Sequence, residues 1–426
     1  MNATRRLPKD LAQEIRDLIL LLSVESEDMD NAGYPKINVY FSRQNLGGLL
    51  LSEDEANKYR KCLSNFIKTL QNDEKIGSRF IERLLQTAIL KSIDIRGNQP
   101  ETSIESRIDQ AIEEMEGELS REPDKYKIFL QVNGISNDGL PIQIGGIKFS
   151  QFDQTELSVF KDRVTKNYSP QEMEDDLRYL LGMVVAEIDV QALDENAAKT
   201  IATNRLRIIL DVINFFTDLV PYSLGFAYIP GEVERQQFMI PIQKNSDSFV
   251  FHYERSEPLD DFSLEKLIQT DNEKHIGFSS IEKMLGNSSN KLQKRIVASV
   301  QWAGRATVYS KRRKEEAFLL YVIALESIIL ADKNPTELSY RLKLRISHLL
   351  GHDSQSRLKI FQTINNLYAI RSGIVHNGQF QVTDADLSVA RYLTKSCLIK
   401  ILVEEPFCSM QSIEKFAQEL EERILH

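Results

Sequence analysis

Hydrophobic residues recur along the chain with helical spacing in some parts and in strand-like runs in others, and the changes between these patterns predict three regions. Residues 1–122 place apolar side chains three or four positions apart, which is the spacing of amphipathic helices. The segment Ser52-Glu53-Asp54-Glu55 has the form of a capping box and predicts that a further helix begins there. We therefore expect a helical N-terminal region that ends near residue 122.

Strand-like sequences appear in the second region, residues 123–285. KIFLQV, which starts at Lys127, and IQIGGIKF, which starts at Ile142, are rich in apolar β-forming residues and are separated by turn formers. Gly145-Gly146 interrupts the second run and predicts a bulge or a turn. The pattern then predicts further elements, namely helices at 154–162, 170–190 and 194–217 and strands in FAYI, FMIPI and FVFHYE. We expect an α+β middle domain.

Helical spacing returns over residues 290–426. Helix-breaking residues interrupt it at four places, which are Lys333-Asn334-Pro335, Gly351-His352-Asp353, Asn377-Gly378 and Glu405-Pro406. Four or five helices of about 12 to 22 residues with short connections predict a helical bundle. The fold class expected for the whole chain is mainly α, with a smaller α+β middle part.

Composition and charge narrow the class of protein. The three cysteines, Cys62, Cys397 and Cys408, are too far apart for a zinc or disulfide motif, so a reducing cytoplasm is the expected location. The longest apolar run, residues 317–331, is too short to cross a membrane and contains Glu326. Although the formal net charge is −9, residues 291–426 carry 20 Lys and Arg against 14 Asp and Glu. This excess is typical of a module that faces a polyanion, and an ordinary solvated surface explains it about as well.

The signatures of phosphate-binding loops, dinucleotide-binding folds, zinc proteases, serine hydrolases and EF-hands are absent from the sequence. We therefore expect no cofactor and no metal site. Candidate chemistry must come from ordinary side chains, and the six histidines are the first to consider for acid-base work.

Three of these histidines follow an arginine by five or seven residues. The pairs are Arg341 with His348, Arg345 with His352, and Arg371 with His376. The first two pairs span about two helical turns, so each pair shares one face of one helix. We interpret that face as an ordinary polar surface.

Arg371 lies in a different setting. It is spaced by steps of three and four from Ile364, Leu367 and Ile374, so it lies on the apolar stripe of its helix. A guanidinium buried there without a partner would cost several kcal/mol. Glu326 holds the same kind of position within residues 317–331. We therefore predict that Arg371 contacts Glu326 from a neighbouring helix.

His376 follows Arg371 by five residues, which is about 140° around a regular helix and about 7.5 Å along its axis. One straight helix therefore cannot present both side chains side by side. The simplest interpretation is a histidine at a helix C-terminus, favoured by the helix dipole and followed by an Asn-Gly cap. The alternative is a catalytic histidine.

Two longer segments connect these residues to a known family. FLLYVIALESIILADKNPTELSYRLKLRISHLLG, followed by IFQTINNLYAIRSGIVHNG, contains an Ala-Leu-Glu helix, a Tyr-Arg-Leu segment and an Arg-x4-His segment in that order. This arrangement resembles the Apea-like branch of the HEPN superfamily, and the resemblance covers about residues 290–410. It implies an HEPN-type bundle that dimerises. Many such proteins are metal-independent endoribonucleases of antiviral defence (abortive infection) or of toxin systems, and some have no nuclease activity.

The resemblance assigns catalytic roles to Arg371 and His376. Glu326, Ser372 and Asn377 are expected to position them, although the family often has Asn, Asp or His where this chain has Ser372. RNA carries its own nucleophile, the 2′-hydroxyl, so His376 would act as acid or base and Arg371 would hold the phosphate. One histidine cannot easily serve both sides of an in-line displacement, so two copies are expected to meet in a homodimer. The products would be a 2′,3′-cyclic phosphate and a 5′-hydroxyl.

Basic residues suggest where RNA would bind. The expected RNA-binding residues are Arg305, Arg312, Arg313, Lys314, Arg341 and Arg345, and Lys291, Lys294, Arg295 and Lys311 lie in the same predicted helical hairpin. Trp302 or Tyr309 could stack a base. Alternatively, KRRKEE is a solvated turn and Trp302 belongs to the core.

The expected partners are RNA, with tRNA or another structured RNA as a candidate, a second copy of the chain, and an unidentified activating ligand or phage protein. No membrane partner is expected. Two other functions stay open. The first is a non-catalytic HEPN sensor or interaction module, in which Arg371 and Glu326 hold the bundle together. The second is a small-ligand site within residues 126–258, which has no motif and would require a distinct pocket.

Overall fold

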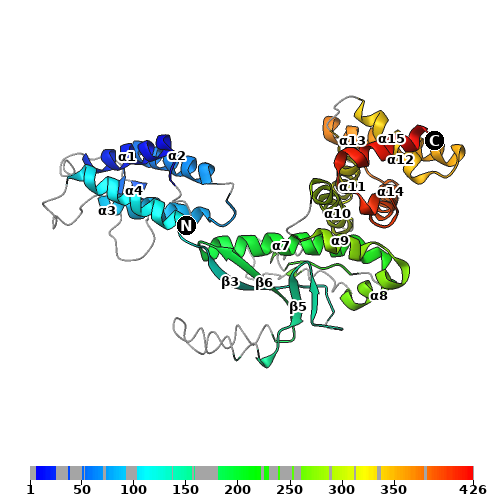
Figure 1. The fold of residues 1–426 in the computed structure, drawn as a ribbon, viewed down its shortest axis with the longest axis horizontal. Helices are drawn as coiled ribbons and strands as arrows, with labels where there is room; N and C mark the ends of the chain where they lie inside the picture. The colour runs from blue at the N-terminus through cyan, green and yellow to red at the C-terminus, as the bar shows by residue number, and fades with distance from the viewer. Residues whose placement is uncertain are drawn as a thin grey trace, which may run out of the picture. The chain divides into compact units, whose positions relative to one another are not determined.

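The computed structural model is mainly α-helical with one small four-stranded sheet, as the sequence predicts (Figure 1). It describes residues 6–24, 37–38, 50–51, 53–70, 73–92, 103–136, 138–155, 158, 181–221, 225–229, 238–239, 252–253, 261–286, 290–310, 313–332, 337–378 and 381–425. Contacts divide the chain into two compact units. Unit 1 comprises Met1–Ile128 and Asp189–Thr203, and unit 2 comprises Phe129–Ile188 and Asn204–His426.

Unit 1 contains the predicted N-terminal helices. These are α1 (Lys9–Val24), α2 (Glu53–Leu70), α3 (Ser78–Ser92) and α4 (Ile104–Ser120), joined by a short antiparallel pair, β1 (Ile37–Asn38) and β2 (Leu50–Leu51). The helices bury their apolar stripes in one core, in which Ile15, Phe66 and Leu85 are fully enclosed. Ser52 of the predicted capping box lies outside the described residues, but α2 begins where that motif predicts.

The sheet is formed by β3 (Asp124–Gln131), β4 (Ile142–Ile144), β5 (Ile147–Gln151) and β6 (Val184–Ala192), in the order β3-β6-β5-β4. β4 pairs with β5 and β5 with β6, both antiparallel. The expected helix over 170–190 is wrong from Leu181 onward, where a turn leads into β6, and residues 170–180 lie outside the described residues. VVAEIDVQA is rich in β-branched residues and alternates buried and more exposed side chains toward its end, which suits a strand.

The Gly145-Gly146 turn connects β4 to β5, which confirms the prediction made for this pair. Both residues have positive φ, 56° and 81°, which is the backbone that a two-residue hairpin turn requires. α7 (Glu195–Phe216) confirms the predicted helix at 194–217 and runs along the sheet (Figure 1). A Cβ on Gly145 would lie 2.5 Å from Cδ1 of Ile209, so α7 packs directly on the turn.

Short elements complete the middle of the chain. They are η1 (Thr217–Leu219), β7 (Phe238–Met239), β8 (His252–Tyr253), α8 (Leu264–Lys274) and α9 (Phe278–Met284). β7 and β8 pair within two of the predicted strand sequences, FMIPI and FVFHYE. The Asp271 carboxylate accepts hydrogen bonds from the backbone N–H groups of Gly277, Phe278 and Ser279, and it thereby fixes the start of α9.

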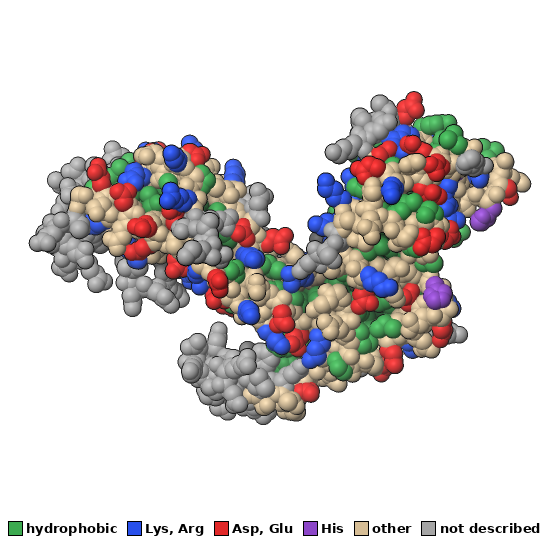
Figure 2. Space-filling view, in the orientation of Figure 1, with side chains coloured by type: hydrophobic (Ala, Val, Ile, Leu, Met, Phe, Trp, Pro, Cys, Tyr) green, Lys and Arg blue, Asp and Glu red, His purple; other side chains and the backbone are tan. Residues whose placement is uncertain are grey.

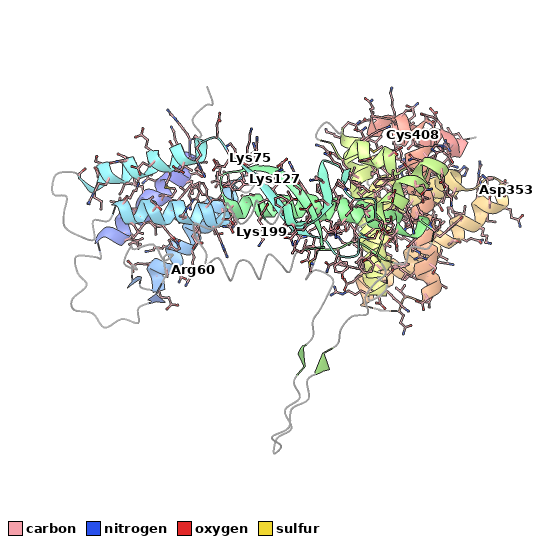
Figure 3. All side chains as sticks on the ribbon, turned by 90° about the horizontal axis from the view of Figure 1, so that it is seen from below. Arg60, Lys75, Lys127, Lys199, Asp353 and Cys408 are labelled. Atoms are coloured by element: carbon pink, nitrogen blue, oxygen red, sulfur yellow. The ribbon has the colours of Figure 1, made fainter. Side chains whose placement is uncertain are left out.

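Six helices form the C-terminal bundle, one more than the upper number expected. They are α10 (Lys291–Tyr309), α11 (Lys314–Ile329), α12 (Leu338–Leu350), α13 (Ser354–Asn377), α14 (Asp384–Val403) and α15 (Ile413–Leu425), with η2 (Phe407–Ser409) between the last two. α11 is central, because it packs against α10, α12, α13 and α14. Asn290, Asp353 and Thr383 close capping boxes that start α10, α13 and α14; Asp353 is labelled in Figure 3.

The bundle and the sheet region belong to the same unit, because α7 packs tightly on α10. A Cβ on Gly304 would lie only 1.7 Å from the backbone oxygen of Asp211. Lys395 of α14 is almost fully buried and donates to the backbone oxygen of Phe215, at 2.6 Å, and to Asp218, at 3.0 Å. The expected boundary near residue 122 lies close to the division at Ile128, whereas the expected boundary at 285–290 does not separate the two units.

No helix within the described ranges is long and apolar enough to cross a membrane.

Candidate functional site

Arg371 of α13 and Glu326 of α11 form an ion pair, as predicted from their positions on apolar stripes. Nε of Arg371 lies 3.6 Å from Oε1 of Glu326. The arginine side chain is 27% exposed and the glutamate side chain 22% exposed, so the pair lies at the edge of the bundle rather than in its centre. The Arg371 side chain therefore contacts Glu326 on the bundle side and is partly accessible to solvent on the other side.

The burial of the Glu326 carboxylate is only partly compensated by this pair. Its Oε1 is buried and has no hydrogen-bond partner among the described residues, since the arginine nitrogen stays beyond hydrogen-bond distance. Burial raises the pKa of the Glu326 carboxyl, and the opposing effects of Arg371 and of a hydrogen bond from Tyr368 do not cancel that rise. The carboxylate thus carries a desolvation cost that the pair only partly offsets.

Tyr368 is a third member of this cluster and was not predicted from the sequence. It lies three residues before Arg371, which places both on one side of α13. The guanidinium carbon lies 5.7 Å from the centre of the Tyr368 ring, within the range of a cation–π contact. Burial and the neighbouring Glu326 raise the pKa of the Tyr368 hydroxyl. The spacing of three residues between Tyr368 and Arg371 is the sequence signal that indicates this contact.

His376 lies at the end of α13, as expected. The helix continues without a break to Asn377, and Gly378, at φ 63°, donates its N–H to the carbonyl of Gly373 as a C-terminal cap. His376 is exposed. Because the helix is regular here, His376 points about 140° away from Arg371 around the axis. The helix-end interpretation is confirmed, and the catalytic role stays a prediction that one copy of α13 cannot fulfil alone.

The other two residues expected to position the catalytic pair, Ser372 and Asn377, lie near the end of α13. Ser372 is partly buried next to Arg371. Asn377 is the last residue of the helix, and its side chain lies outside the described residues. Their positioning roles therefore stay predictions.

Arg345 does not lie on a polar surface, and this corrects the interpretation given to the Arg345 and His352 pair. Its side chain is 1% exposed and donates to Asp332, to Glu421 and to the carbonyl of Ile329 near the end of α11. A guanidinium enclosed by these acceptors cannot reach an RNA phosphate, so Arg345 is removed from the expected RNA-binding set. Arg341 pairs with the same Asp332 and is 15% exposed.

α10 carries three basic and two aromatic residues along one outward stripe. Lys291, Arg295, Trp302, Arg305 and Tyr309 recur at helical spacing, and each is exposed or partly exposed. The Arg305 guanidinium lies 5.5 Å from the Trp302 ring centre, and that of Arg313 lies 5.6 Å from the Tyr309 ring centre. Basic and aromatic side chains therefore share one face of α10, with Ala298 between Arg295 and Trp302, and Trp302 is partly exposed rather than in the core.

Acidic residues form ion pairs with Arg305 of this stripe and with Arg313 and Lys314 at the start of α11. Arg305 pairs with Asp211 at 2.7 Å, Arg313 with Glu316 at 3.0 Å, and Lys314 with Asp384 at 2.6 Å. Lys311 and Arg312 lie outside the described residues. Figure 2 likewise shows Lys and Arg interspersed with Asp and Glu over the visible face. Any RNA must therefore compete with these exposed pairs, which are individually weak.

The cysteines and acidic groups are the other reactive groups to consider. Among the described residues, no group of three or more His, Cys, Asp or Glu side chains could hold a metal ion. Burial raises the pKa of Cys62 to about 12 and that of Cys397 still further, and burial together with Glu405 raises the pKa of Cys408, which is labelled in Figure 3. Thiols with raised pKa values are poor nucleophiles.

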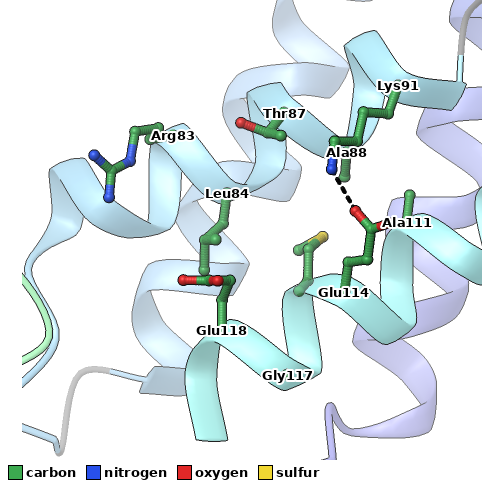
Figure 4. Close-up of a pocket in the computed structure, with 10 residues that line it drawn as sticks. Arg83, Leu84, Thr87, Ala88, Lys91, Ala111, Glu114, Gly117 and Glu118 are labelled. Atoms are coloured by element: carbon green, nitrogen blue, oxygen red, sulfur yellow. Dashed lines mark hydrogen bonds and ion pairs between the residues drawn. The ribbon is translucent and has the colours of Figure 1, made fainter. Parts of the chain in front are cut away.

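A groove of about 440 Å³ lies between α3 and α4 in unit 1 (Figure 4). Leu84 and Met115 are among the residues that line it, and Lys91 bridges it to Glu114 by an ion pair. The Lys91 hydrogen bond holds the pKa of the Glu114 carboxyl below its usual value. The ion pair engages two of the charged side chains that line the groove, and Arg83 and Glu118 are the other two.

No family model, no curated protein and no solved structure matches the chain.

Proposed function

We propose that the chain is a metal-independent endoribonuclease of the HEPN type, with Arg371 and His376 as its catalytic residues. The observation that carries the proposal is the environment of Arg371. It lies on an apolar stripe, beside a carboxylate that it does not hydrogen-bond, and a quarter of its side chain is exposed. A purely structural arginine would use its donors inside the protein, as Arg345 does.

The donors of Arg371 suit a phosphate. Within the described part of the chain, this guanidinium makes no hydrogen bond, and its ion pair uses Nε. Its two terminal nitrogens can therefore hold a phosphate in bidentate geometry and stabilise the charge that develops on it. Glu326 and Tyr368 would keep the guanidinium in place from below.

His376 would supply the proton transfer from a second copy of the chain. An imidazole can both accept and donate a proton, so this side chain has the chemistry of a general acid or base. Leu358 lies eighteen residues before His376, about five turns along the same face of α13, and is 58% exposed. An exposed leucine on the histidine face suits a surface that a second copy covers. Two copies would bring one Arg371 within reach of the partner's histidine.

The α10 stripe supports an RNA route toward this cluster. Arg295 donates to the carbonyl of Ser327 at 3.2 Å, and Ser327 directly follows Glu326. The hydroxyls of Ser299 and Ser327 lie 2.5 Å apart, which fixes α10 against this end of α11. Arg295 therefore lies close to the part of the α11 backbone that carries Glu326. Phosphates on the stripe would lead the strand toward Arg371.

The non-catalytic module remains the second candidate, because the same ion pair could simply join α11 to α13. In that case Arg371→Ala would impair folding, and His376→Ala would change neither folding nor RNA cleavage. The two candidates predict opposite results for the exposed histidine.

The test is an RNA cleavage assay with excess chelator, using a tRNA mixture, an unstructured RNA and DNA of matching sequence. Wild type is compared with His376→Ala, Arg371→Ala and His352→Ala; His352 is an exposed histidine at the other end of α13 and serves as the control. Cleavage of RNA alone, with 2′,3′-cyclic phosphate ends, that is lost in His376→Ala but kept in His352→Ala supports the proposal. Cleavage that persists in His376→Ala, or that requires magnesium, refutes it.

The location and control of the enzyme follow from the same proposal. Its substrate would be cytoplasmic RNA, so the cytoplasm is the proposed site of action. A nuclease of this kind requires restraint, and a role in antiviral defence or a toxin system would require a trigger. Unit 1 is the proposed receiver of an activating ligand or phage protein.

A further inference from the structure

A pocket of about 770 Å³ lies within unit 2, away from Arg371 and His376. It is bounded by the Gly145-Gly146 turn, by β6, by α7 and by the end of α9. This volume is within the range of pockets that hold small organic ligands. The pocket lies partly within the middle region, where the sequence offered no motif.

The inner surface of the pocket is mainly aliphatic. The apolar residues that line it are Ile147, Ile188, Ile208, Ile209 and Leu285. Ile208 is 38% exposed and lies beside the exposed Arg207, whereas Ile209 and Leu210, which follow it on α7, are buried. An isoleucine that faces an open cavity gains from contact with an apolar ligand. No aromatic ring lines the pocket, so a stacked base is not the natural occupant.

The polar residues at the pocket leave an excess of positive charge. Arg205 and Lys283 are the two cations, and Glu282 is the one acid. The Glu282 carboxylate already accepts a hydrogen bond from the N–H of Gly145, and its partial burial raises its pKa. Gln143 adds one neutral polar group. An anionic ligand group at the pocket therefore lies near two cations, of which Arg205 also interacts within the chain, and near an acid that is engaged with Gly145.

The glycine turn keeps the mouth of the pocket open. A Cβ on Gly146 would meet no atom within 4 Å, so the space beside it is unfilled. Positive φ favours glycine here, and the missing side chain leaves the backbone accessible to a ligand.

We propose that this pocket binds a small amphipathic anion, with an aliphatic or other apolar body among the isoleucines and one acidic group at Arg205 and Lys283. The proposal does not depend on nuclease activity. Both helices that line the pocket also support the bundle. Gly277, at the start of α9, packs against Leu402 of α14, and α7 carries the Asp211 that pairs with Arg305. Binding therefore stabilises unit 2 as a whole.

Fluorescence of anilinonaphthalene sulfonate, an apolar anion, tests the proposal on the full chain. Wild type should bind it saturably at one site, with decanoate as a competitor and decyltrimethylammonium as a matched cation that does not compete. Ile208→Glu and Lys283→Glu each place negative charge at the pocket and should weaken binding about tenfold or more. Because Ile208 and Lys283 are already exposed, both variants should keep the wild-type circular dichroism spectrum.

Matched controls separate the pocket from general surface effects. Ile323→Glu changes an isoleucine on α11 that is 36% exposed, and Lys274→Glu changes an exposed lysine at the end of α8. Neither residue lines the pocket, and both variants should bind the probe within about twofold of wild type. The proposal is overturned if wild type shows no saturable site, if both pocket variants bind like their controls, or if the cation competes as well as decanoate.

Discussion

Neutralising Glu326 should stabilise the bundle or leave it unchanged, whereas removing its partner Arg371 should destabilise it. The reason is the direction of the pKa of Glu326, which burial raises despite the nearby guanidinium. A carboxyl with a raised pKa is more stable in the fold when it is protonated. Glu326→Gln imitates that state with almost the same shape, while Arg371→Met leaves the buried carboxylate without its cation.

The separation of the two charges sets the size of the effect. Two unit charges 3.6 Å apart, at an effective dielectric constant of about 20, attract each other by about 4 to 5 kcal/mol before desolvation is counted. Desolvation of two side chains that are about three-quarters buried offsets most of that energy. We expect Arg371→Met to cost about 2 kcal/mol and Glu326→Gln to change stability by less than about 1 kcal/mol. In the Glu326→Gln background, Arg371→Met should cost less than it does alone.

Urea unfolding followed by circular dichroism, at several pH values, measures these energies. Because folding raises the pKa of Glu326, the folded state binds more protons, and wild-type stability should fall as pH rises from the ordinary glutamate pKa toward the folded value. Glu326→Gln should remove that part of the slope. Glu404→Gln breaks an exposed pair with Lys400 and serves as the control, with a change of about 0.5 kcal/mol or less. A loss of more than about 2 kcal/mol in Glu326→Gln would refute the reasoning, because the charged pair would then be a net stabiliser.

Three further predictions concern the interior. Arg345→Met should destabilise unit 2 by about 3 to 5 kcal/mol in urea unfolding, because it removes the hydrogen bonds that Arg345 donates to Asp332 and to the carbonyl of Ile329. A loss below about 1 kcal/mol would contradict the burial argument. Gly304→Ala should cost about 3 kcal/mol in the same assay, because its Cβ meets the backbone of Asp211, and wild-type stability would show that α7 and α10 separate easily. Cys62 and Cys397 should resist alkylation at pH 8 until urea unfolds the chain, as measured by mass spectrometry, and rapid labelling of the native protein would show that their burial is incomplete.

Elements with a strong period or a clear boundary were predictable from the sequence. The bundle helices end at Gly351, at Asn377 and before Pro406 because those residues cap or break helices for local reasons. The helices of unit 1 and the β4–β5 turn follow for the same reason. Local chemistry therefore determined most of the element boundaries in the two helical regions.

The failures involve information that is not local. Val184–Ala192 was expected to be helical because a short apolar run satisfies both periods, and pairing with β5 decides for a strand. Arg345 was assigned to a polar surface because its neighbours in sequence are partly polar. Asp332 and Glu421, which enclose it, are thirteen and seventy-six residues away. No spacing rule along one helix can reveal a partner on α15.

Arg371 and His376, the proposed catalytic residues, show both what the sequence predicts and what it cannot. Periodicity placed Arg371 on the apolar stripe, and that placement was sufficient to predict its contact with Glu326, because stripes of adjacent helices must face each other. The same periodicity placed His376 about 140° away, and the unbroken helix retains that separation. A side chain cannot turn around its own helix, so no rearrangement of α13 as a rigid helix joins the two residues. If they act on one phosphate, the histidine must come from another copy of the chain. Mixing two inactive variants, each of which keeps one of the two residues, tests that requirement. Subunits carrying only Arg371→Ala and subunits carrying only His376→Ala should then restore about a quarter to a half of wild-type cleavage when mixed, because half of the mixed dimers' sites are intact.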